Sequence, residues 1–471
     1  MKTILWLRED LRLYDNLALN QAAADGEVIP VFFYPEHLGG ASYWWLHHSL
    51  SRLAEQFAEH GVTLILRTGD PARVVLKLCE EIGSTKVVFN RVYSSRGMAQ
   101  GQAVKQALQG ADIECQSFNS QLLFEPGKIF NKQGTPFKVF TPFWKHCCAQ
   151  LQPPAPQAFT TLKPVGDQPD SEQLSDWGLL PTRPNWAQGL ADTWQPGEAG
   201  AQQRWQEFLN DRIQGYKEGR DFPEREQTSL LSPHLTFGEI SPRQLWHDTQ
   251  EAMASGLVDA SNGNKFLAEI GWREFSRYLL VHFPQIETEA FNQKFADFPW
   301  KNSAKLLKAW QKGETGYPIV DAGMRELWHT GYMHNRVRMI VASFLTKHCL
   351  VHWQSGMDWF WDTLVDADVA NNTASWQWVA GCGADAAPYF RIFNPILQGE
   401  KHDKLGVYVR RWVPELKKMP NKTIHQPWTA DEETLAEAGV KLGKDYPRPI
   451  VDHADARAEA LAAYQAIKSS S

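Results

Sequence analysis

Short apolar runs alternate with helical stretches through the first 125 residues, and this alternation constrains the fold more than any other feature of the chain. The helical stretches end at glycines such as Gly26 and Gly61. Continuous apolar runs are typical of strands buried on both faces, and their alternation with helices indicates a parallel sheet with helices on each side. We therefore predict an α/β N-terminal domain with a Rossmann-like, doubly wound parallel sheet. The predicted strands lie within residues 3–7, 28–34, 62–70 and 86–90.

The rest of the chain changes character twice. A chain of 471 residues exceeds one ordinary hydrophobic core, so two domains are expected. Residues 151–200 are rich in Pro, Gln and Gly, which is typical of a connector that runs over the surface. After residue 200 helical patterns punctuated by Pro and Gly dominate. We predict an α/β domain over residues 1–130, a linker over 131–200 and a large all-helical domain over 201–471.

Several classes of function are disfavoured by what the sequence lacks. No G-x-G-x-x-G follows the first predicted strand and no P-loop motif occurs, so neither an NAD-type nor a P-loop nucleotide site is supported. The six cysteines form no C-x-x-C pair, so neither a zinc ribbon nor an iron–sulfur site is indicated and we expect no metal. No run of eighteen apolar residues occurs, and the N-terminus meets charge after a few apolar residues. We expect a cytoplasmic monomer that does not engage membranes. The net charge of −6 disfavours a bulk nucleic-acid binder but leaves room for a local basic patch.

The segment from Asp366 to Trp378 combines acids, amides and indoles in an unusual way. Asp366 and Asp368 precede two adjacent asparagines, and two tryptophans separated by one glutamine follow. A packing stripe does not need the amides, and a solvated loop does not need the indoles. This composition favours a segment that surrounds a flat, redox-active, hydrogen-bonding ring and connects it to a path for electrons.

Three further stretches of the helical part carry polar groups on single helix faces or at helix starts. Glu269 and Trp272 are three residues apart, and Asn335, Arg338 and Met339 share another face. Arg338 can pair with Asp366. Each pattern alone also fits an ordinary structural role, either the amphipathic boundary of a helix or a structural ion pair. The hydroxyls of Thr228, Ser229 and Ser232 precede a helix and suit either helix capping or phosphate binding. Together these stretches indicate a cradle for a flavin dinucleotide.

Five motifs of the helical part resemble the DNA photolyase/cryptochrome family: WREF, GYMHNRVRM, DADVANN, WQW and GADAAPYFRIFNPILQGEKHD. The resemblance extends over about residues 1–428 and includes the N-terminal WLREDLRLYDNLAL. It implies that the helical domain binds FAD, reduced and anionic when active, in a folded conformation. Asn372 is implied to face the N5 atom of the flavin, Asp366 and Asp368 its edge, and the basic neighbours are Arg273 and Arg338. The cofactor-binding positions carried over by the resemblance are Tyr216, Thr228, Ser229, Leu230, Leu231, Ser232, Phe266, Arg273, Arg338, Asp366, Ala367, Asp368 and Asn372.

The resemblance also implies a catalytic relay and a substrate. Trp376, Trp353 and Trp300 match the tryptophans that carry an electron between the surface and the flavin, although a core position remains open for each. Trp272 and Trp378 match indoles that clamp a flipped pyrimidine dimer, and Glu269 matches the acid that contacts the dimer carbonyls. The implied DNA-contacting positions are Arg220, Glu269, Trp272, Asn335, Arg336, Met339, Trp378 and Gln398.

These positions favour light-dependent repair of cyclobutane pyrimidine dimers, with UV-damaged DNA as the partner. The alternatives are a blue-light photoreceptor without repair and a (6-4) photolyase. Members of the (6-4) class carry histidine where this chain has Met339. Phe266 replaces a tryptophan that is usual in one bacterial branch. The antenna site also departs from that branch, since Arg91 follows Asn90, and the FNRVYSSRG stretch around Tyr93 resembles the plant-cryptochrome-like bacterial branch known as class III. A methenyl-tetrahydrofolate antenna near Asn90 and Tyr93 is expected, with a deazaflavin or no antenna as alternatives.

Overall fold

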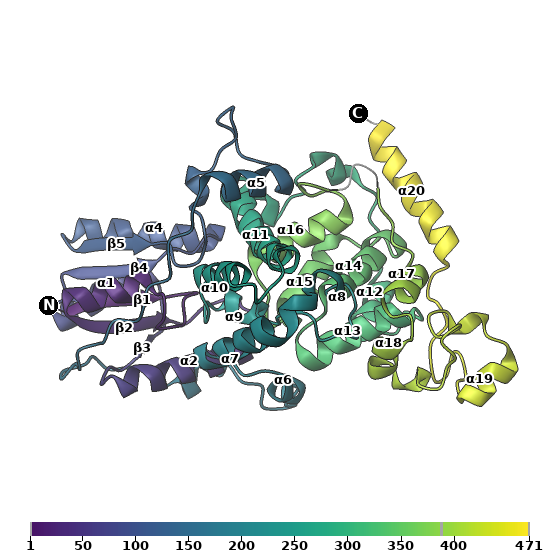
Figure 1. The fold of residues 1–471 in the computed structure, drawn as a ribbon, viewed down its shortest axis with the longest axis horizontal. Helices are drawn as coiled ribbons and strands as arrows, with labels where there is room; N and C mark the ends of the chain where they lie inside the picture. The colour runs from purple at the N-terminus through teal and green to yellow at the C-terminus, as the bar shows by residue number, and fades with distance from the viewer. Residues whose placement is uncertain (1, 387–389, 470–471) are drawn as a thin grey trace. The chain divides into compact units, whose positions relative to one another are not determined.

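A five-stranded parallel sheet forms the N-terminal part of the chain in the computed structural model, which describes residues 2–386 and 390–469 (Figure 1). The strand order is β3-β2-β1-β4-β5. In the register of the sheet, Ile4 of the central strand pairs with Ile29 on one side and Val87 on the other. The predicted doubly wound parallel sheet is thereby confirmed. The strands are β1 (Lys2–Leu7), β2 (Glu27–Phe33), β3 (Ile65–Arg67), β4 (Lys86–Asn90) and β5 (Glu114–Phe118).

Strand β5 is the strand that the apolar pattern did not predict. Its sequence, ECQSF, is polar, and its residues are half-buried or exposed, whereas β3 at the opposite edge of the sheet is apolar and mostly buried. The four predicted strands are apolar since helices cover them. The flanking helices are α1 (Leu17–Asp25), α2 (Gly40–Glu59), α3 (Pro71–Ile82) and α4 (Ser95–Gly110).

The chain divides into two compact units, and the division differs from the predicted domain boundaries. Unit 1 comprises residues 1–214 and 229–284, and unit 2 comprises residues 215–228 and 285–471. The helices of residues 229–284 belong with the sheet because buried polar contacts join them to it. Arg243 pairs with Asp15 at 2.8 Å, and the Trp45 indole donates to Glu239 at 2.9 Å. The helices concerned are α9 (Ser232–Thr236), α10 (Pro242–Ala254) and α11 (Ala260–His282).

The predicted linker over residues 131–200 includes helices as well as extended chain. Its extended part follows the N-terminal sheet, since Val165 donates its backbone N–H to Gly61 and Glu172 donates to Leu66. Its helical parts, with the helix that follows, are α5 (Phe140–Gln150), α6 (Gln188–Thr193) and α7 (Glu198–Glu207). Backbone hydrogen bonds therefore hold the extended part of the connector against the N-terminal sheet and its helices.

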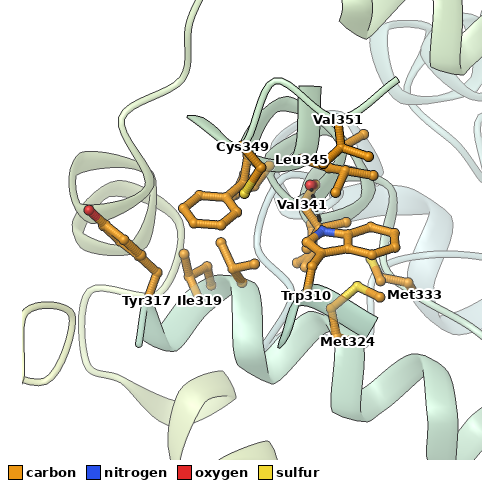
Figure 2. Close-up of a cluster of buried hydrophobic side chains, with 14 of the residues drawn as sticks. Trp310, Tyr317, Ile319, Met324, Met333, Val341, Leu345, Cys349 and Val351 are labelled. Carbon is orange, nitrogen blue, oxygen red and sulfur yellow. Dashed lines mark hydrogen bonds between the residues drawn. The ribbon is translucent and has the colours of Figure 1, made fainter. Parts of the chain in front are cut away.

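Unit 2 is helical, as predicted, and has a buried core around Trp310 (Figure 2). The Trp310 indole donates to the carbonyl of Val341 at 2.9 Å, which satisfies its polar atom inside apolar surroundings. Met324, Leu345 and Val351 belong to the same cluster. The helices are α8 (Tyr216–Gly219), α12 (Ala304–Lys312), α13 (Pro318–Thr330), α14 (Asn335–Ser343), α15 (Trp353–Thr363), α16 (Val369–Ala380), α17 (Pro395–His402), α18 (Val407–Trp412), α19 (Glu432–Ala438) and α20 (His453–Ser469).

The C-terminal segment is packed into unit 2. Tyr446 donates its buried hydroxyl to the Asp321 carboxylate at 2.6 Å. On α20, the Tyr464 ring stacks on Phe390 with centroids 4.5 Å apart. This segment therefore supports the core that positions α14, α15 and α16.

Candidate functional site

Helix α14 carries Asn335, Arg336, Arg338 and Met339 in its first two turns. The Arg338 guanidinium donates through Nη2 to the Asp366 carboxylate at 2.7 Å and through Nε to the carbonyl of Met333 at 2.7 Å. The predicted pair of Arg338 with Asp366 is confirmed. The Asp366 side chain is only 3% exposed, so this pair joins α14 to the segment before α16 in a region of low dielectric.

Helix α16 begins just after the acidic pair and presents an oriented amide. Asp368 is its N-cap and accepts the backbone N–H of Asn371 at 2.8 Å. One turn further, the Asn372 amide donates to the carbonyl of Met357 at 3.0 Å. Asn372 is buried, and the hydrogen bond fixes which way its amide points. A guanidinium, a carboxylate and an oriented amide in one unit fit a flat ring that offers both donors and acceptors, such as a flavin.

The three tryptophans predicted to form a relay lie in unit 2 and range from buried to half-buried. Trp376 and Trp353 are each 2% exposed, whereas Trp300 is half-buried. The ring of His352 lies 5.1 Å from Trp300 and 5.5 Å from Trp353, measured between centroids. Trp376 packs directly against Gly356, one turn after Trp353 on α15, where any side chain larger than hydrogen would clash with the indole. Helix α15 or its N-cap therefore contacts or contains each of the three indoles: His352 contacts Trp300, Trp353 begins the helix, and Gly356 contacts Trp376.

The segment with Thr228, Ser229 and Ser232 passes from unit 2 into unit 1. Leu230 has a left-handed backbone conformation with φ of 53°, which is uncommon for a leucine. Leu231 is the N-cap of the short helix α9, so Ser232 occupies its first turn and not the cap. Leu231 is buried and Ser232 is exposed. In unit 2, Tyr216 is buried and the Arg220 guanidinium lies 5.6 Å from its ring centroid.

Helix α11 of unit 1 holds the predicted residues Phe266, Glu269, Trp272 and Arg273. Phe266 packs between the rings of Trp205 and Phe208, with centroids 5.5 and 5.0 Å away. Glu269 pairs with Lys265 at 2.9 Å, and both side chains are partly exposed.

Neighbouring positions on α11 differ in how much surface they leave open. Trp272 is half-buried, and one face of its indole stacks on Phe140 at 3.8 Å. Arg273 is buried and donates to the carbonyl of Gln121 at 2.8 Å, which ties α11 to the N-terminal part. Arg273 therefore has a structural role, because it connects α11 to the segment around Gln121. Its cofactor role remains a prediction.

A second charged cluster surrounds Arg336 in unit 2. Its guanidinium pairs with Asp221 at 2.7 Å and reaches the Met339 sulfur at 3.8 Å. His334 and His402 are both buried nearby. Burial, together with the charge of Arg220, lowers the pKa of His334 to about 3, and burial with Arg336 lowers that of His402 to about 4. Asp221, His334 and His402 were not predicted, because a lone histidine or aspartate beside a motif carries no periodic signal.

Trp378 stands on the last turn of α16 and is half-buried. Its indole donates to the carbonyl of Asp385 at 3.0 Å. The buried Lys347 caps the same helix end, since its ammonium donates to Ala380 at 2.8 Å and lies 3.2 Å from the Phe390 ring centroid. Gln398 lies on α17 and is half-buried. Residues 387–389 of the GADAAPYFRIFNPILQGEKHD motif lie outside the described residues.

Asn90 and Tyr93, the predicted antenna residues, have partners inside the protein. The Asn90 amide donates to Asp10 at 2.6 Å and to Asn16 at 2.7 Å, and it accepts from Ser120 at 2.8 Å. Tyr93 donates to Glu125 at 3.1 Å. Most of the hydrogen-bonding groups of the Asn90 side chain are thus already bonded to residues around the end of β4.

The described residues contain neither a metal-binding cluster nor a membrane-spanning helix. Residues 2–386 and 390–469 hold no cluster of three or more His, Cys, Asp or Glu side chains arranged to bind a metal ion. None of the helices in this part of the chain is long and apolar enough to span a membrane.

Comparison with known proteins gives consistent similarities along the chain. Residues 3–161 match the family described as DNA photolyase, and residues 266–466 match the FAD binding domain of DNA photolyase. A protein of Agrobacterium fabrum named deoxyribodipyrimidine photo-lyase is 52% identical, covering 99% of this chain and 98% of its own length. Cryptochrome-2 of Arabidopsis thaliana is 38% identical and covers 97% of this chain, which spans 77% of that protein.

Solved structures agree with these sequence matches. A bacterial class III photolyase from Agrobacterium tumefaciens superposes with a TM-score of 0.97 and 51% identity, covering 99% of this chain and 98% of its own. A cryptochrome of Synechocystis sp. PCC6803 superposes with a TM-score of 0.89 and 29% identity, covering 98% and 99%. The chain therefore belongs to the DNA photolyase family and carries the FAD-binding domain of that family.

Proposed function

We propose that this protein is a deoxyribodipyrimidine photo-lyase that repairs cyclobutane pyrimidine dimers in DNA under light. The observation that carries the proposal is the make-up of α16, which holds Asn372, Trp376 and Trp378 within two turns. One rigid helix thereby carries an oriented amide for the cofactor, a buried indole for electron transfer and a half-buried indole for the substrate. The 52% identity to a protein named deoxyribodipyrimidine photo-lyase supports this assignment.

FAD, bound and reduced, supplies the light-excited electron that opens the cyclobutane ring of the dimer. The residues proposed to hold it in unit 2 are Asn372, Arg338, Asp366 and Asp368, with Tyr216 and Thr228. The Arg338–Asp366 pair keeps a positive group and a buried carboxylate in fixed positions. The hydrogen bond from Asn372 to Met357 keeps the amide from rotating. The other residues proposed to hold FAD are Leu230, Leu231, Phe266 and Arg273, with Ser229 and Ser232.

The proposed lesion contacts are acidic, aromatic and polar side chains. Glu269 and Trp272 on α11 supply a carboxylate and an indole, and Trp378 supplies a second indole. Base–aromatic stacking binds an extruded base without reading its sequence, which suits a damaged dinucleotide. Met339 offers a soft apolar contact at the position that is histidine in (6-4) photolyases. Arg220, Arg336, Asn335 and Gln398 are proposed to contact the DNA strand.

For the antenna we propose 5,10-methenyltetrahydrofolate, with a deazaflavin or no antenna as the alternatives. Because Asn90 is engaged by Asp10, Asn16 and Ser120, its own contribution to an antenna site is expected to be small. Chromatography of the pigments released from purified protein tests this, since a folate and a deazaflavin separate readily.

The proposed function is tested with flavin-reduced protein and a duplex that holds a thymine cyclobutane dimer. Light-dependent recovery of intact thymines, absent in the dark, is the expected result. The second candidate, a photoreceptor without repair, draws on the 38% identity to Cryptochrome-2. It predicts light-driven flavin reduction with no recovered thymine.

A further inference from the structure

His334 holds the start of α14 through one of its two ring nitrogens. Its Nδ1 accepts the backbone N–H of Arg336 at 3.2 Å, which makes His334 the N-cap of the helix. A nitrogen that accepts a hydrogen bond carries no proton, so this contact assigns the ring proton of the neutral imidazole to Nε2. His334 therefore presents an N–H donor from Nε2.

That donor is buried and has no hydrogen-bond partner among the residues that the structure describes. His334 is 4% exposed. Buried polar groups in proteins are almost always satisfied, because leaving one unpaired costs the full desolvation of the group. A second buried donor without a partner, Nε of Arg336, belongs to the same cluster. Nε2 of His334 and Nε of Arg336 therefore each lack an acceptor among the described residues.

The charges around His334 indicate what kind of acceptor fits. The charged groups that act on it are Arg220 and Asp221 after α8 and Arg336 and Arg338 on α14. Glu326 of α13 also faces it and accepts the backbone N–H of His334 at 3.5 Å. His402 of α17 faces Asp221 and Arg336. Arg338 is paired with Asp366, which leaves Asp221 as the carboxylate that Arg336 contacts. With Glu326 counted, guanidinium and carboxyl groups are equal in number, so the unused N–H donors of His334 and Arg336 are what favours an oxygen ligand. A guanidinium donor binds an anionic oxygen more strongly than a neutral one.

We propose that His334 is a DNA-binding residue whose Nε2–H, beside Arg220 and Arg336, donates to a phosphate oxygen of the damaged strand once the side chains that cover Nε2 in the free protein move aside. This inference rests on the proposed function, since it takes DNA as the ligand. Arg336 already lies over Met339, so its guanidinium is on the proposed lesion side of α14. Asp221 holds the guanidinium of Arg336 in place in the free protein.

The imidazole acts as a neutral donor in this proposal. Burial and the neighbouring Arg220 lower the pKa of His334 to about 3, so it does not titrate between roughly pH 5.5 and 8.5. A neutral donor releases no counterion from DNA, whereas an arginine on a phosphate does. The contact of His334 therefore differs from that of Arg336 in two measurable ways, its dependence on pH and its dependence on salt.

His334→Asn separates the two functions of the ring. Asparagine is a favoured N-cap, so its oxygen can accept the Arg336 N–H, but it is too short to place a donor where Nε2 lies. His352 offers a matched control, because it caps α15 in the same way, with Nδ1 accepting the Gln354 N–H at 3.2 Å, and it is only half-buried. His352→Asn makes the same chemical change without removing a buried, unpartnered donor.

The measurement is dark binding of flavin-loaded protein to a duplex with one cyclobutane dimer, across a series of salt concentrations. We expect His334→Asn to weaken binding about tenfold, with flavin content and salt slope unchanged. Arg336→Ala is expected to lower the salt slope by about 1, and His352→Asn to bind like the unaltered protein. His334→Ser, which also caps well and lacks the donor, replaces the asparagine variant if that variant does not fold.

Unchanged affinity in a folded His334→Asn variant overturns the proposal. So does a loss of affinity that follows a loss of flavin, because the donor would then serve the cofactor. A ratio of the two affinities that changes around pH 6.5 overturns the neutral-donor account. Failure of the proposed function is distinguished by the unaltered protein, which in that case does not prefer the dimer duplex over undamaged DNA.

Discussion

The Arg338 guanidinium and the Asp366 carboxylate form a hydrogen-bonded ion pair at 2.7 Å, and the Asp366 side chain is 3% exposed. Asp366→Ala leaves Arg338 without its partner, and removing one member of a buried pair is costly. We expect the free energy of unfolding to fall by about 3 kcal/mol, measured by urea denaturation. Glu459→Gln breaks the exposed pair with Lys301 and is the control, with a change within about 1 kcal/mol. Equal effects of the two variants would contradict the account of a buried pair.

Gly356 is predicted to be required by the Trp376 indole. A Cβ added at Gly356 meets the six-membered ring of Trp376, so Gly356→Ala forces the indole or the helix to move. We expect a loss of about 1–3 kcal/mol in unfolding free energy, together with slower photoreduction of oxidised flavin. Gly110→Ala at the end of α4, where the added Cβ meets nothing within 4 Å, is the control and is expected to be neutral or slightly stabilising. A stabilising Gly356→Ala with normal photoreduction would contradict the packing described here.

Trp376→Phe separates photoreduction from repair. The indole is buried and packs on α15 against Gly356, three residues after Trp353. Phenylalanine is far harder to oxidise than tryptophan, so light should no longer reduce the oxidised flavin. Protein reduced chemically beforehand should still repair dimers, because the relay is not needed for that step. Unchanged photoreduction, followed by absorbance, would mean that electrons reach the flavin by another route.

Glu269→Gln tests the proposed lesion contact on α11. The flavin should remain bound while the yield of repair per absorbed photon falls, because the amide N–H of glutamine is a weaker donor to the dimer carbonyls than a carboxyl O–H. Glu269 is paired with Lys265 at 2.9 Å in the free protein. Lys265→Ala therefore serves as the control, since it removes the pair and keeps the carboxylate. Full yield in Glu269→Gln removes this residue from the mechanism.

Glu326 is predicted to make stability depend on pH. Burial raises its pKa to about 7 although the Tyr408 hydroxyl, 2.5 Å away, acts in the opposite direction. Since the folded state then binds its proton more tightly than the unfolded state, this contribution is complete below about pH 4.5 and is lost as pH rises through 7. It amounts to at most about 3 kcal/mol. Glu326→Gln should flatten the decline in unfolding free energy between those values, and an unchanged profile would contradict the assignment.

Periodicity and local capping made much of the fold predictable from sequence. The apolar runs around Ile4 and Val87 indicated buried parallel strands, whereas β5 was missed because its polar sequence, ECQSF, contains no apolar run. The domain boundary was not predictable, since it depends on the long-range pair of Asp15 with Arg243. In the site, helical spacing predicted that Arg338 can reach Asp366. The burial of His334 follows from tertiary packing, which its sequence neighbours do not reveal.

The most direct test of the central claim uses reduced, flavin-loaded protein and two oligonucleotides, one with a thymine cyclobutane dimer and one with a (6-4) lesion. Both are illuminated with blue light, and intact thymines are quantified by chromatography against dark controls. The account predicts light-dependent recovery from the cyclobutane substrate alone. Recovery from neither, with the flavin shown to be bound and reduced, would contradict it and favour a photoreceptor. Recovery from the (6-4) lesion would show that Met339 does not set the substrate.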